Sequence, residues 1–152
     1  MRNSTALFYS PLGSVRVEAG AKGIVSAGFS RVPVGKKTAP ARFLKKCIRQ
    51  MNQYFKGSRT HFTVKLDLKG TPFQRKVWSE LVKIPHGKTV SYLELARRIS
   101  HPRSARAVGS AAGANPVCIL VPCHRLVASK GLGGYAYGLP TKKKLLKLEA
   151  SQ

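Results

Sequence analysis

Acidic residues are scarce in this sequence of 152 residues: five Asp and Glu stand against 28 Lys and Arg, which gives a formal net charge of +23. Self-repulsion on that scale favours a polyanionic partner, so we expect nucleic acid first and an acidic membrane surface second. Thermal adaptation explains the charge poorly, because it normally adds Glu alongside Lys. Each remaining carboxylate, Glu149 among them, therefore carries more information than usual.

Cysteines and long apolar runs are also few. The cysteines, Cys47, Cys118 and Cys123, are odd in number and unevenly spaced, so we expect no disulfide scaffold and a reducing compartment. No apolar run reaches about 18 residues, which excludes a transmembrane helix. The segment Met1 to Leu12 is too polar and too short for a secretory signal. Apolar residues still make up 43% of the chain, which excludes a disordered tail.

The first part of the chain alternates between strand and helix patterns. Val15, Val17 and Ala19 alternate with polar residues and predict a half-buried strand, and Ile24 to Phe29 predicts the next strand of a meander. A further alternation over Phe62, Val64, Leu66 and Leu68 predicts another strand.

Between these strands the spacing is helical. Apolar side chains recur on one helical face from Ala41 to Lys56, and Gly57 is a good stop. Arg31 to Pro40 is rich in Pro, Gly and Lys and predicts an exposed loop. We therefore expect a small α/β domain over residues 1–68, followed by a second domain over 69–152.

The second part has the pattern of short helices. Thr71 and Pro72 are typical of a helix start, and the buried face of that helix is predicted to hold Phe73, Val77, Trp78, Leu81 and Val82. Ser91 and Glu94 predict a capping box for a second helix, and a third runs from about Arg103 to Ala114. Short helices joined by a tight turn, with arginines, predict a helix-turn-helix.

The rest of this domain is predicted to hold a strand, a loop and a helix. Val117 to Val121 is an unbroken apolar run of strand length, and Gly131 to Gly138 is a glycine-rich loop with two tyrosines. Leu145, Leu146 and Leu148 predict a short final helix.

The third predicted helix holds almost nothing bulky after Arg106. Its small residues, Ala107 to Gly113, fit two interpretations equally well. They allow close packing in a core, or they let the helix backbone approach a DNA groove while Arg106 reaches into the base stack.

Cys123 and His124 directly follow the apolar run. A cysteine there is more often inert core than nucleophile, but a neighbouring His lowers the cost of forming a thiolate. Glu149 could accept from that His and fix its tautomer. A zinc site is weakly indicated, because Cys118 and Cys123 have no second cysteine pair, and Cys47 fits packing on a helix face.

The second part of the chain resembles the O6-alkylguanine-DNA alkyltransferases. The motifs that carry the resemblance, in the expected order, are Ser91-Tyr92, Ser104-Ala105-Arg106-Ala107-Val108-Gly109, Asn115-Pro116, Pro122-Cys123-His124-Arg125, Gly133-Gly134-Tyr135 and Leu145-Leu146-Lys147-Leu148-Glu149. The resemblance covers about Thr71 to Glu149. It implies an RNase H-like α/β first domain, a small antiparallel sheet with a helix, and a mostly α winged helix-turn-helix second domain that is presented to the minor groove.

The resemblance also implies catalytic roles. Cys123 would accept the alkyl group, His124 would act as base through a water, and Glu149 would orient His124. Asn115 would sit at the hinge between the recognition helix and the active-site strand. The protein would act once per molecule, without a cofactor.

Further implied roles concern DNA. Tyr92 would crowd a phosphate and help to rotate the damaged nucleotide out, and Arg106 would take its place in the stack. Tyr135 and the backbone around Ala136 would line the guanine pocket with Tyr92, near the carbonyl of Leu126. A backbone contact to DNA is implied at Ser129.

Two departures from the family bear on function. Position 136 is Ala where many relatives carry Ser, so only the backbone amide remains there. Some relatives hold zinc in the first domain, but here that domain has only Cys47 and His61, so we predict no metal.

The implied partner is double-stranded DNA that contains O6-alkylguanine, bound by a monomer that does not associate with membranes. The protein would be cytoplasmic and nucleoid-associated in a prokaryote or nuclear in a eukaryote. The alternatives left open are a non-catalytic reader of alkylated DNA, and a Cys-His hydrolase, for which nothing indicates an oxyanion hole.

Overall fold

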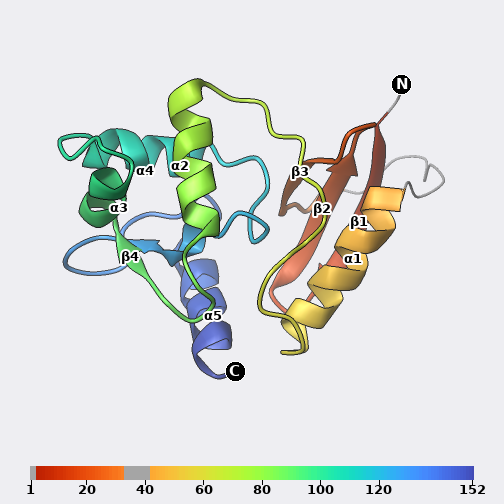
Figure 1. Ribbon diagram of the computed structural model, residues 1–152. Helices are drawn as coiled ribbons and strands as arrows, with labels where there is room; N and C mark the ends of the chain where they lie inside the picture. The colour runs from red at the N-terminus through yellow and green to blue at the C-terminus, as the bar shows by residue number, and fades with distance from the viewer. Residues whose placement is uncertain (1–2, 33–41) are drawn as a thin grey trace. The chain divides into compact units, whose positions relative to one another are not determined.

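The chain folds into two compact units, Met1–Lys69 and Gly70–Gln152. The computed structural model (Figure 1) describes residues 3–32 and 42–152. The predicted loop from Arg31 to Pro40 lies mostly outside these residues. In the described part of the chain, no helix has both the length and the apolar character needed to cross a membrane.

Unit 1 is an antiparallel sheet with one helix. The sheet has the order β1 (Ser4–Ser10), β2 (Gly13–Ala19), β3 (Ile24–Phe29), and α1 (Arg42–Phe55) lies across it (Figure 1). The alternation in β2 is confirmed, since its apolar side chains are buried. Strand β1 was not predicted from the sequence, because its side chains do not alternate between buried and exposed. Only Phe8 is buried, and the other side chains are half-buried or exposed.

Helix α1 follows the predicted face and stop. Its buried side chains are Leu44, Cys47, Gln50, Met51 and Tyr54. Gly57 has φ +81° and ends the helix, with Gly57 N–H donating to Tyr54 and Ser58 N–H donating to Gln53. A residue without a side chain is favoured at this left-handed position.

The strand predicted over Phe62–Leu68 is wrong. Only Leu66 makes a bridge, to Ile24, where Ile24 N–H donates to Lys65 (2.9 Å) and Asp67 N–H donates to Ile24 (2.8 Å). The side chain of Gln50 accepts from the N–H groups of Thr63 (2.9 Å) and Val64 (3.2 Å). The side chain of the buried Gln50 thus binds the backbone N–H groups that a neighbouring strand would otherwise bind.

Unit 2 begins with the predicted helix. Helix α2 (Pro72–Val82) has Thr71 and Gln74 in a reciprocal capping box. Val77, Trp78 and Leu81 are buried as expected. Val82 was assigned to the same face, but its side chain is 53% exposed. Trp78 donates from Nε1 to the carbonyl of Ala111 (2.8 Å) and so ties α2 to the helix α4 (Ala105–Gly113).

The helix-turn-helix consists of α3 (Tyr92–Arg98) and α4 (Ala105–Gly113), which pack against each other. The predicted capping box is only half formed. Ser91 Oγ accepts from Glu94 N–H (3.1 Å), but the carboxylate of Glu94 pairs with Arg97 (4.0 Å) and Arg98 (3.4 Å). Before α3 lies β4 (Val90–Ser91), which pairs in parallel with β5 (Leu126–Val127).

The strand predicted over Val117–Val121 is also wrong: this buried run is a turn. Val121 N–H donates back to Val117 (3.0 Å), Leu120 N–H donates to Cys118 (2.8 Å), and Ile119 has φ +71°. A positive φ at a β-branched residue is costly and is tolerated only where the surroundings impose it. The run is uniformly apolar because the turn is wholly buried, which is why its pattern resembled a central strand.

The chain closes with a short 3-10 helix η1 (Cys123–Arg125) and the helix α5 (Leu139–Ala150). Helix α5 starts directly after Gly138, six residues before the first leucine of the predicted helix. Two of its buried residues, Lys142 and Glu149, are charged. The loop before it contains the predicted glycine-rich segment.

Candidate active site

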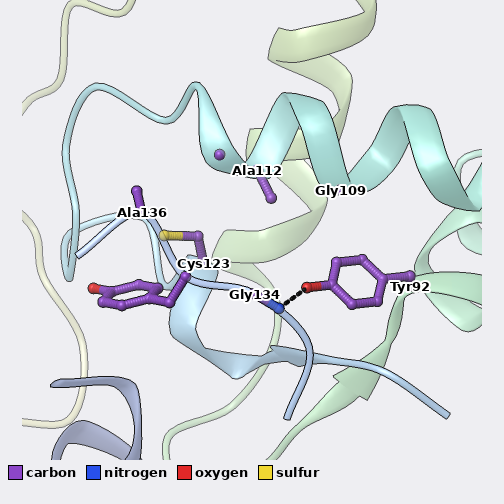
Figure 2. A pocket seen from close by; sticks show the side chains of 8 residues that line it. Tyr92, Gly109, Ala112, Cys123, Gly134 and Ala136 are labelled. Carbon is purple, nitrogen blue, oxygen red and sulfur yellow. Dashed lines mark hydrogen bonds between the residues drawn. The ribbon is translucent and has the colours of Figure 1, made fainter. Parts of the chain in front are cut away.

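A cavity of about 250 Å³ lies in unit 2 where α3, α4, η1 and the glycine-rich loop meet. Its lining residues are Tyr92, Gly109, Ala112, Gly113, Cys123, Gly134, Tyr135 and Ala136. Figure 2 shows the sulfur of Cys123 among these side chains. The cysteine is 8% exposed, so it is reached through this cavity rather than from open solvent.

Asn115 holds the turn that precedes Cys123. Its Nδ2 donates to the carbonyl of Val121 (2.8 Å), and its Oδ1 accepts from Val117 N–H (3.0 Å). The peptide N–H of Cys123 in turn donates to the same Val121 carbonyl (2.8 Å). Asn115 lies at the end of α4, so one buried amide fixes the path from that helix to the cysteine.

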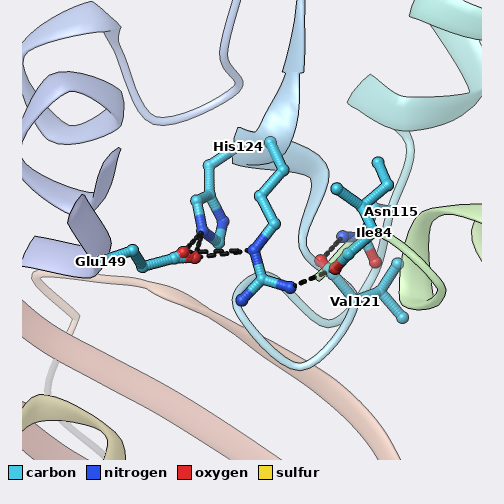
Figure 3. Close-up of polar contacts among 6 residues, drawn as sticks. Ile84, Asn115, Val121, His124 and Glu149 are labelled. Carbon is cyan, nitrogen blue, oxygen red and sulfur yellow. Dashed lines mark hydrogen bonds and ion pairs between the residues drawn. The ribbon is translucent and has the colours of Figure 1, made fainter. Parts of the chain in front are cut away.

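The two residues that follow Cys123 in the chain belong to a buried network centred on Glu149 (Figure 3). Nε2 of His124 lies 2.8 Å and 3.0 Å from the carboxylate oxygens of Glu149. Arg125 donates from Nε to the same carboxylate (2.7 Å) and from a terminal nitrogen to the carbonyl of Ile84 (2.7 Å). Nδ1 of His124 is buried and has no hydrogen-bond partner among the described residues.

Burial sets the protonation states of this site. It raises the pKa of the Cys123 thiol, although the Asn115 side chain and the charge of Lys142 act in the opposite direction. Burial also lowers the pKa of His124, against the effect of Glu149. The resting site therefore holds a protonated thiol beside a neutral imidazole that can take a proton.

Tyr92 is wedged between α4 and the glycine-rich loop. Its hydroxyl accepts from Gly134 N–H (3.2 Å), as Figure 2 shows. A Cβ at Gly109 would lie 3.4 Å from the ring, and one at Gly133 would lie 2.6 Å from the hydroxyl oxygen. Glycine at 133, which has φ +71°, is thus needed for the Tyr92 side chain to occupy this place.

Lys142 holds the same loop through hydrogen bonds to its backbone carbonyls. This residue was not identified from the sequence. It is completely buried, and its Nζ donates to the carbonyls of Leu126 (2.6 Å), Leu132 (2.5 Å) and Gly134 (2.9 Å). Lys142 is the first of three consecutive lysines, and side chains in such a run are usually exposed to solvent. The available signal was its spacing to Leu145 and Glu149, which places the three on one face of a helix.

The remaining predicted site residues fall in three places. Tyr135 and Ala136 line the cavity with Tyr92. Arg106 is exposed in the first turn of α4, on a groove of about 700 Å³ that Tyr92 also lines. Ser129 is exposed at a bend after β5. Leu126 does not line the cavity, and its carbonyl accepts from Lys142.

The small residues of α4 are divided between core packing, one of the two interpretations left open above, and the lining of the cavity and the groove. The other interpretation, approach of the helix backbone to a DNA groove, stays a prediction. Val108, Ala111 and Ala112 are buried against the rest of unit 2. Gly109, Ser110 and Gly113 line the cavity or the adjoining groove. Close packing and an open path to the cavity therefore coexist on one helix.

Metal binding has no support in the described part of the chain. No group of three His, Cys, Asp or Glu side chains lies close enough there to hold an ion. Cys47 is buried on α1, and burial raises its pKa to about 12. An inert packing role suits this cysteine.

Comparison with family models identifies both units. Residues 72–151 match the DNA binding domain of 6-O-methylguanine DNA methyltransferase, and residues 4–68 match its ribonuclease-like domain. The chain belongs to the 6-O-methylguanine DNA methyltransferase family.

Individual relatives agree with this assignment. The methylated-DNA--protein-cysteine methyltransferase of Methanosarcina acetivorans is 41% identical over 96% of this chain and 97% of its own. A probable methylated-DNA--protein-cysteine methyltransferase of Acanthamoeba polyphaga mimivirus is 49% identical over 70% of this chain and 72% of its own. The crystal structure of Mycobacterium tuberculosis O6-methylguanine methyltransferase superimposes with a TM-score of 0.87 at 37% identity, covering 99% of this chain and 94% of that one. The structure of that organism's OGT in complex with DNA gives a TM-score of 0.87 at 38% identity, covering 97% and 93%.

Proposed function

We propose that this protein repairs DNA by direct reversal, moving an alkyl group from O6 of guanine in duplex DNA irreversibly onto Cys123. The observation that carries the proposal is that Cys123 lies on the wall of a cavity while the next residue in the chain, His124, is paired with the buried carboxylate of Glu149. Membership of the 6-O-methylguanine DNA methyltransferase family supports the same reaction.

The substrate must leave the double helix to be reached. O6 of guanine lies inside the base stack, so a buried sulfur meets the alkyl carbon only after the nucleotide is extruded. Extrusion costs a few kcal/mol, and less for a poorly paired lesion. We expect Arg106, which is exposed at the start of α4, to fill the vacated space, and Tyr92 to crowd the backbone phosphate.

The transfer is a displacement at carbon. The thiol proton of Cys123 passes through a water molecule to Nδ1 of His124, while Glu149 accepts from Nε2 and stabilises the imidazolium. The thiolate then attacks the alkyl carbon in line, and the bond from that carbon to O6 breaks. The electron pair of that bond leaves with guanine, which takes up one proton.

Two groups can donate a hydrogen bond to the departing guanine, and of these only the Tyr92 hydroxyl can also supply its proton, which the extra proton on His124 restores through water. The hydroxyl of Tyr92 accepts from Gly134 N–H, so its own hydrogen points to another acceptor. The peptide N–H at Ala136 lies in the cavity wall, where the family often adds a serine hydroxyl. Donors aimed at developing charge are effective in a site that excludes water.

The thioether product is stable, so each molecule acts once. A monomer suffices for this reaction, because Cys123, His124 and Glu149 all come from unit 2 of one chain. Neither a metal nor an organic cofactor enters the reaction. The site therefore behaves as a stoichiometric reagent rather than a turnover catalyst.

Mass spectrometry after incubation with an O6-methylguanine duplex tests the proposal. We expect the Cys123 peptide to gain the mass of one methylene, and no gain for Cys123→Ser or for an undamaged duplex. A gain on another peptide, or none, would contradict the assignment. Preferred binding of the damaged duplex without any transfer would instead identify a non-catalytic reader of alkylated DNA.

A further inference from the structure

The outer face of α1 carries only positive charge. The helix contains no acidic residue, and its buried side chains face the sheet. The α1 basic face, as we define it, consists of Arg42, Lys45, Lys46, Arg49 and Lys56. All of these side chains are exposed or half-buried. At 1.5 Å per residue, the face extends for about 21 Å.

These cations have no acidic partners. Among the described residues, every ion pair lies in unit 2. The carboxylates of unit 1 are Glu18 and Asp67, and Glu18 accepts from Asn3 instead. The guanidinium of Arg42 stacks over the ring of its neighbour Phe43, 4.9 Å from the ring centroid.

The charge pattern also opposes helix stability. Arg42 lies in the first turn, where the helix dipole disfavours a cation. Lys45 and Arg49 are four residues apart, and like charges at this spacing repel. Helix α3 shows the opposite arrangement, with Glu94 in its first turn and Arg97 and Arg98 in its last. Folding therefore does not explain the α1 pattern, whereas a bound polyanion would relieve it.

We propose that the α1 basic face is a second DNA-binding surface, which contacts backbone phosphates independently of the helix-turn-helix. Lysine and arginine at one helical face bind phosphates without selecting bases or lesions. The surface needs neither Cys123 nor an extruded nucleotide, so it goes beyond the function proposed above.

DNA suits this surface better than a membrane does. A helix that lies in a bilayer interface inserts its apolar face, but in α1 that face is buried in the core, with Leu44, Met51 and Tyr54 fully covered. The large apolar side chains that are exposed in the described residues, such as Tyr9 and Val32, all lie outside α1.

Two matched variants of the full chain test the proposal. Lys45→Gln, Arg49→Gln and Lys56→Gln together neutralise the α1 basic face. Lys22→Gln, Lys65→Gln and Lys69→Gln remove the same charge from exposed sites elsewhere in unit 1. Binding of an undamaged duplex is measured by fluorescence anisotropy over a range of salt concentrations.

We expect the α1 variant to reduce the slope of log K against log salt by about 2.5 to 3, since each lost phosphate contact removes about 0.9. The control variant should change it by less than about 1. Equal reductions would mean a diffuse charge effect and would overturn the proposal. An unchanged slope, with lost binding to vesicles of anionic phospholipid, would overturn it in favour of a membrane.

Two further readouts separate this inference from loss of fold and from the proposed function. Thermal unfolding of the α1 variant should occur at the same or a higher temperature, because repulsion within the helix is relieved. Both variants should alkylate Cys123 with free O6-benzylguanine at the wild-type rate. Should no form of the protein be alkylated, the repair proposal fails while the salt slopes still decide the role of α1.

Discussion

The carboxylate of Glu149 lies 2.8 Å from Nε2 of His124, and this contact determines which nitrogen of the ring can act as a base. Since Nε2 carries the hydrogen that Glu149 accepts, Nδ1 is left as the proton acceptor. The same carboxylate accepts from Nε of Arg125 at 2.7 Å. Glu149 therefore orients the imidazole of His124 and neutralises a buried cation at the same time.

Replacing Glu149 by Gln should impair both functions. We expect alkyl transfer to slow by about 10²-fold, because the imidazolium is no longer stabilised. The free energy of unfolding should fall by about 3 kcal/mol, because the charge of Arg125 is left buried and unpaired. Single-turnover kinetics with O6-benzylguanine and urea unfolding measure the two effects.

A double variant separates these effects. Adding Arg125→Met to Glu149→Gln removes the unpaired cation, so most of the lost stability should return while transfer stays slow. Recovery of the rate together with the stability would show that Glu149 acts only through the fold.

The buried imidazole predicts a dependence of stability on pH. Burial lowers the pKa of His124 below its ordinary value of 6.5. At a pH between the two values, the unfolded chain therefore binds a proton at His124 that the folded protein does not. The contribution of His124 to the free energy of unfolding is fully present above pH 6.5 and declines as the pH falls below it. Urea midpoints between pH 8 and pH 5 should show this decline, and His124→Gln should flatten it.

Glu149 contributes in a more acidic range. Burial alone would raise its pKa, but the hydrogen bonds and charges of His124 and Arg125 outweigh burial, so the pKa lies below the ordinary 4.5. Its contribution to stability is present above pH 4.5 and is lost as the pH falls through the lowered value. A decline that appears only below pH 4.5, with none between pH 6.5 and pH 4.5, would contradict a neutral buried His124.

Local patterns predicted the helices well. Thr71 and Pro72 correctly predicted the start of α2, and Gly57 correctly predicted the end of α1. The predicted fold class of both units also agrees with the family. Patterns failed where a side chain replaces a strand partner. Gln50 takes the backbone donors of Thr63 and Val64, and neither the alternation nor the composition of that segment reveals this.

Gly133 offers a test of the Tyr92 position. Alanine at 133 would have a strained backbone and would place its Cβ 2.6 Å from the Tyr92 hydroxyl oxygen. Gly131 also has a positive φ, +105°, but nothing lies within 4 Å of a Cβ there. We expect Gly133→Ala to slow transfer from duplex DNA by about tenfold, the loss of roughly one hydrogen bond. Gly131→Ala should cost only about 1 kcal/mol of stability. Equal transfer rates in the two variants would show that the position of Tyr92 does not matter for extrusion of the nucleotide.

Arg106 can be tested by comparing two substrates. Arg106→Ala should slow repair of an O6-methylguanine duplex by at least about tenfold. The reason is that no side chain would then offset the few kcal/mol that unstacking the base costs. The reaction with free O6-benzylguanine should not change, since no base stack needs filling. Arg103→Ala removes an equal charge from an exposed site just before α4 and serves as the control. Equal losses on both substrates would contradict the proposed role.

The site itself shows what a sequence can and cannot reveal. Cys123, His124 and Glu149 could be grouped because each is chemically unusual in so basic a chain, and the structure brings His124 and Glu149 into contact. Lys142 could not be grouped with them by type, because lysine is common here and almost always solvated. Its spacing to Leu145 and Glu149 places it on the buried face of the helix, and the position of its Nζ between three backbone carbonyls then distinguishes it from Lys143.

Lys142 should shape the cavity wall rather than the reactivity of the sulfur. Lys142→Met keeps an unbranched chain but releases the carbonyls of Leu132 and Gly134, so the loop that carries Tyr135 loses its support. We expect stability to fall by about 2 kcal/mol and the reaction with O6-benzylguanine to slow by about tenfold. Alkylation of Cys123 by iodoacetamide, which needs no purine pocket, should change much less.

The neighbouring Lys143→Met removes an equal charge from an exposed position of α5 and should leave both rates unchanged. The two reagents decide between the possible roles of Lys142. Equal slowing with iodoacetamide and O6-benzylguanine would show that the buried ammonium acts on the thiol through its charge, whereas selective slowing with the purine would show that it acts by positioning the loop.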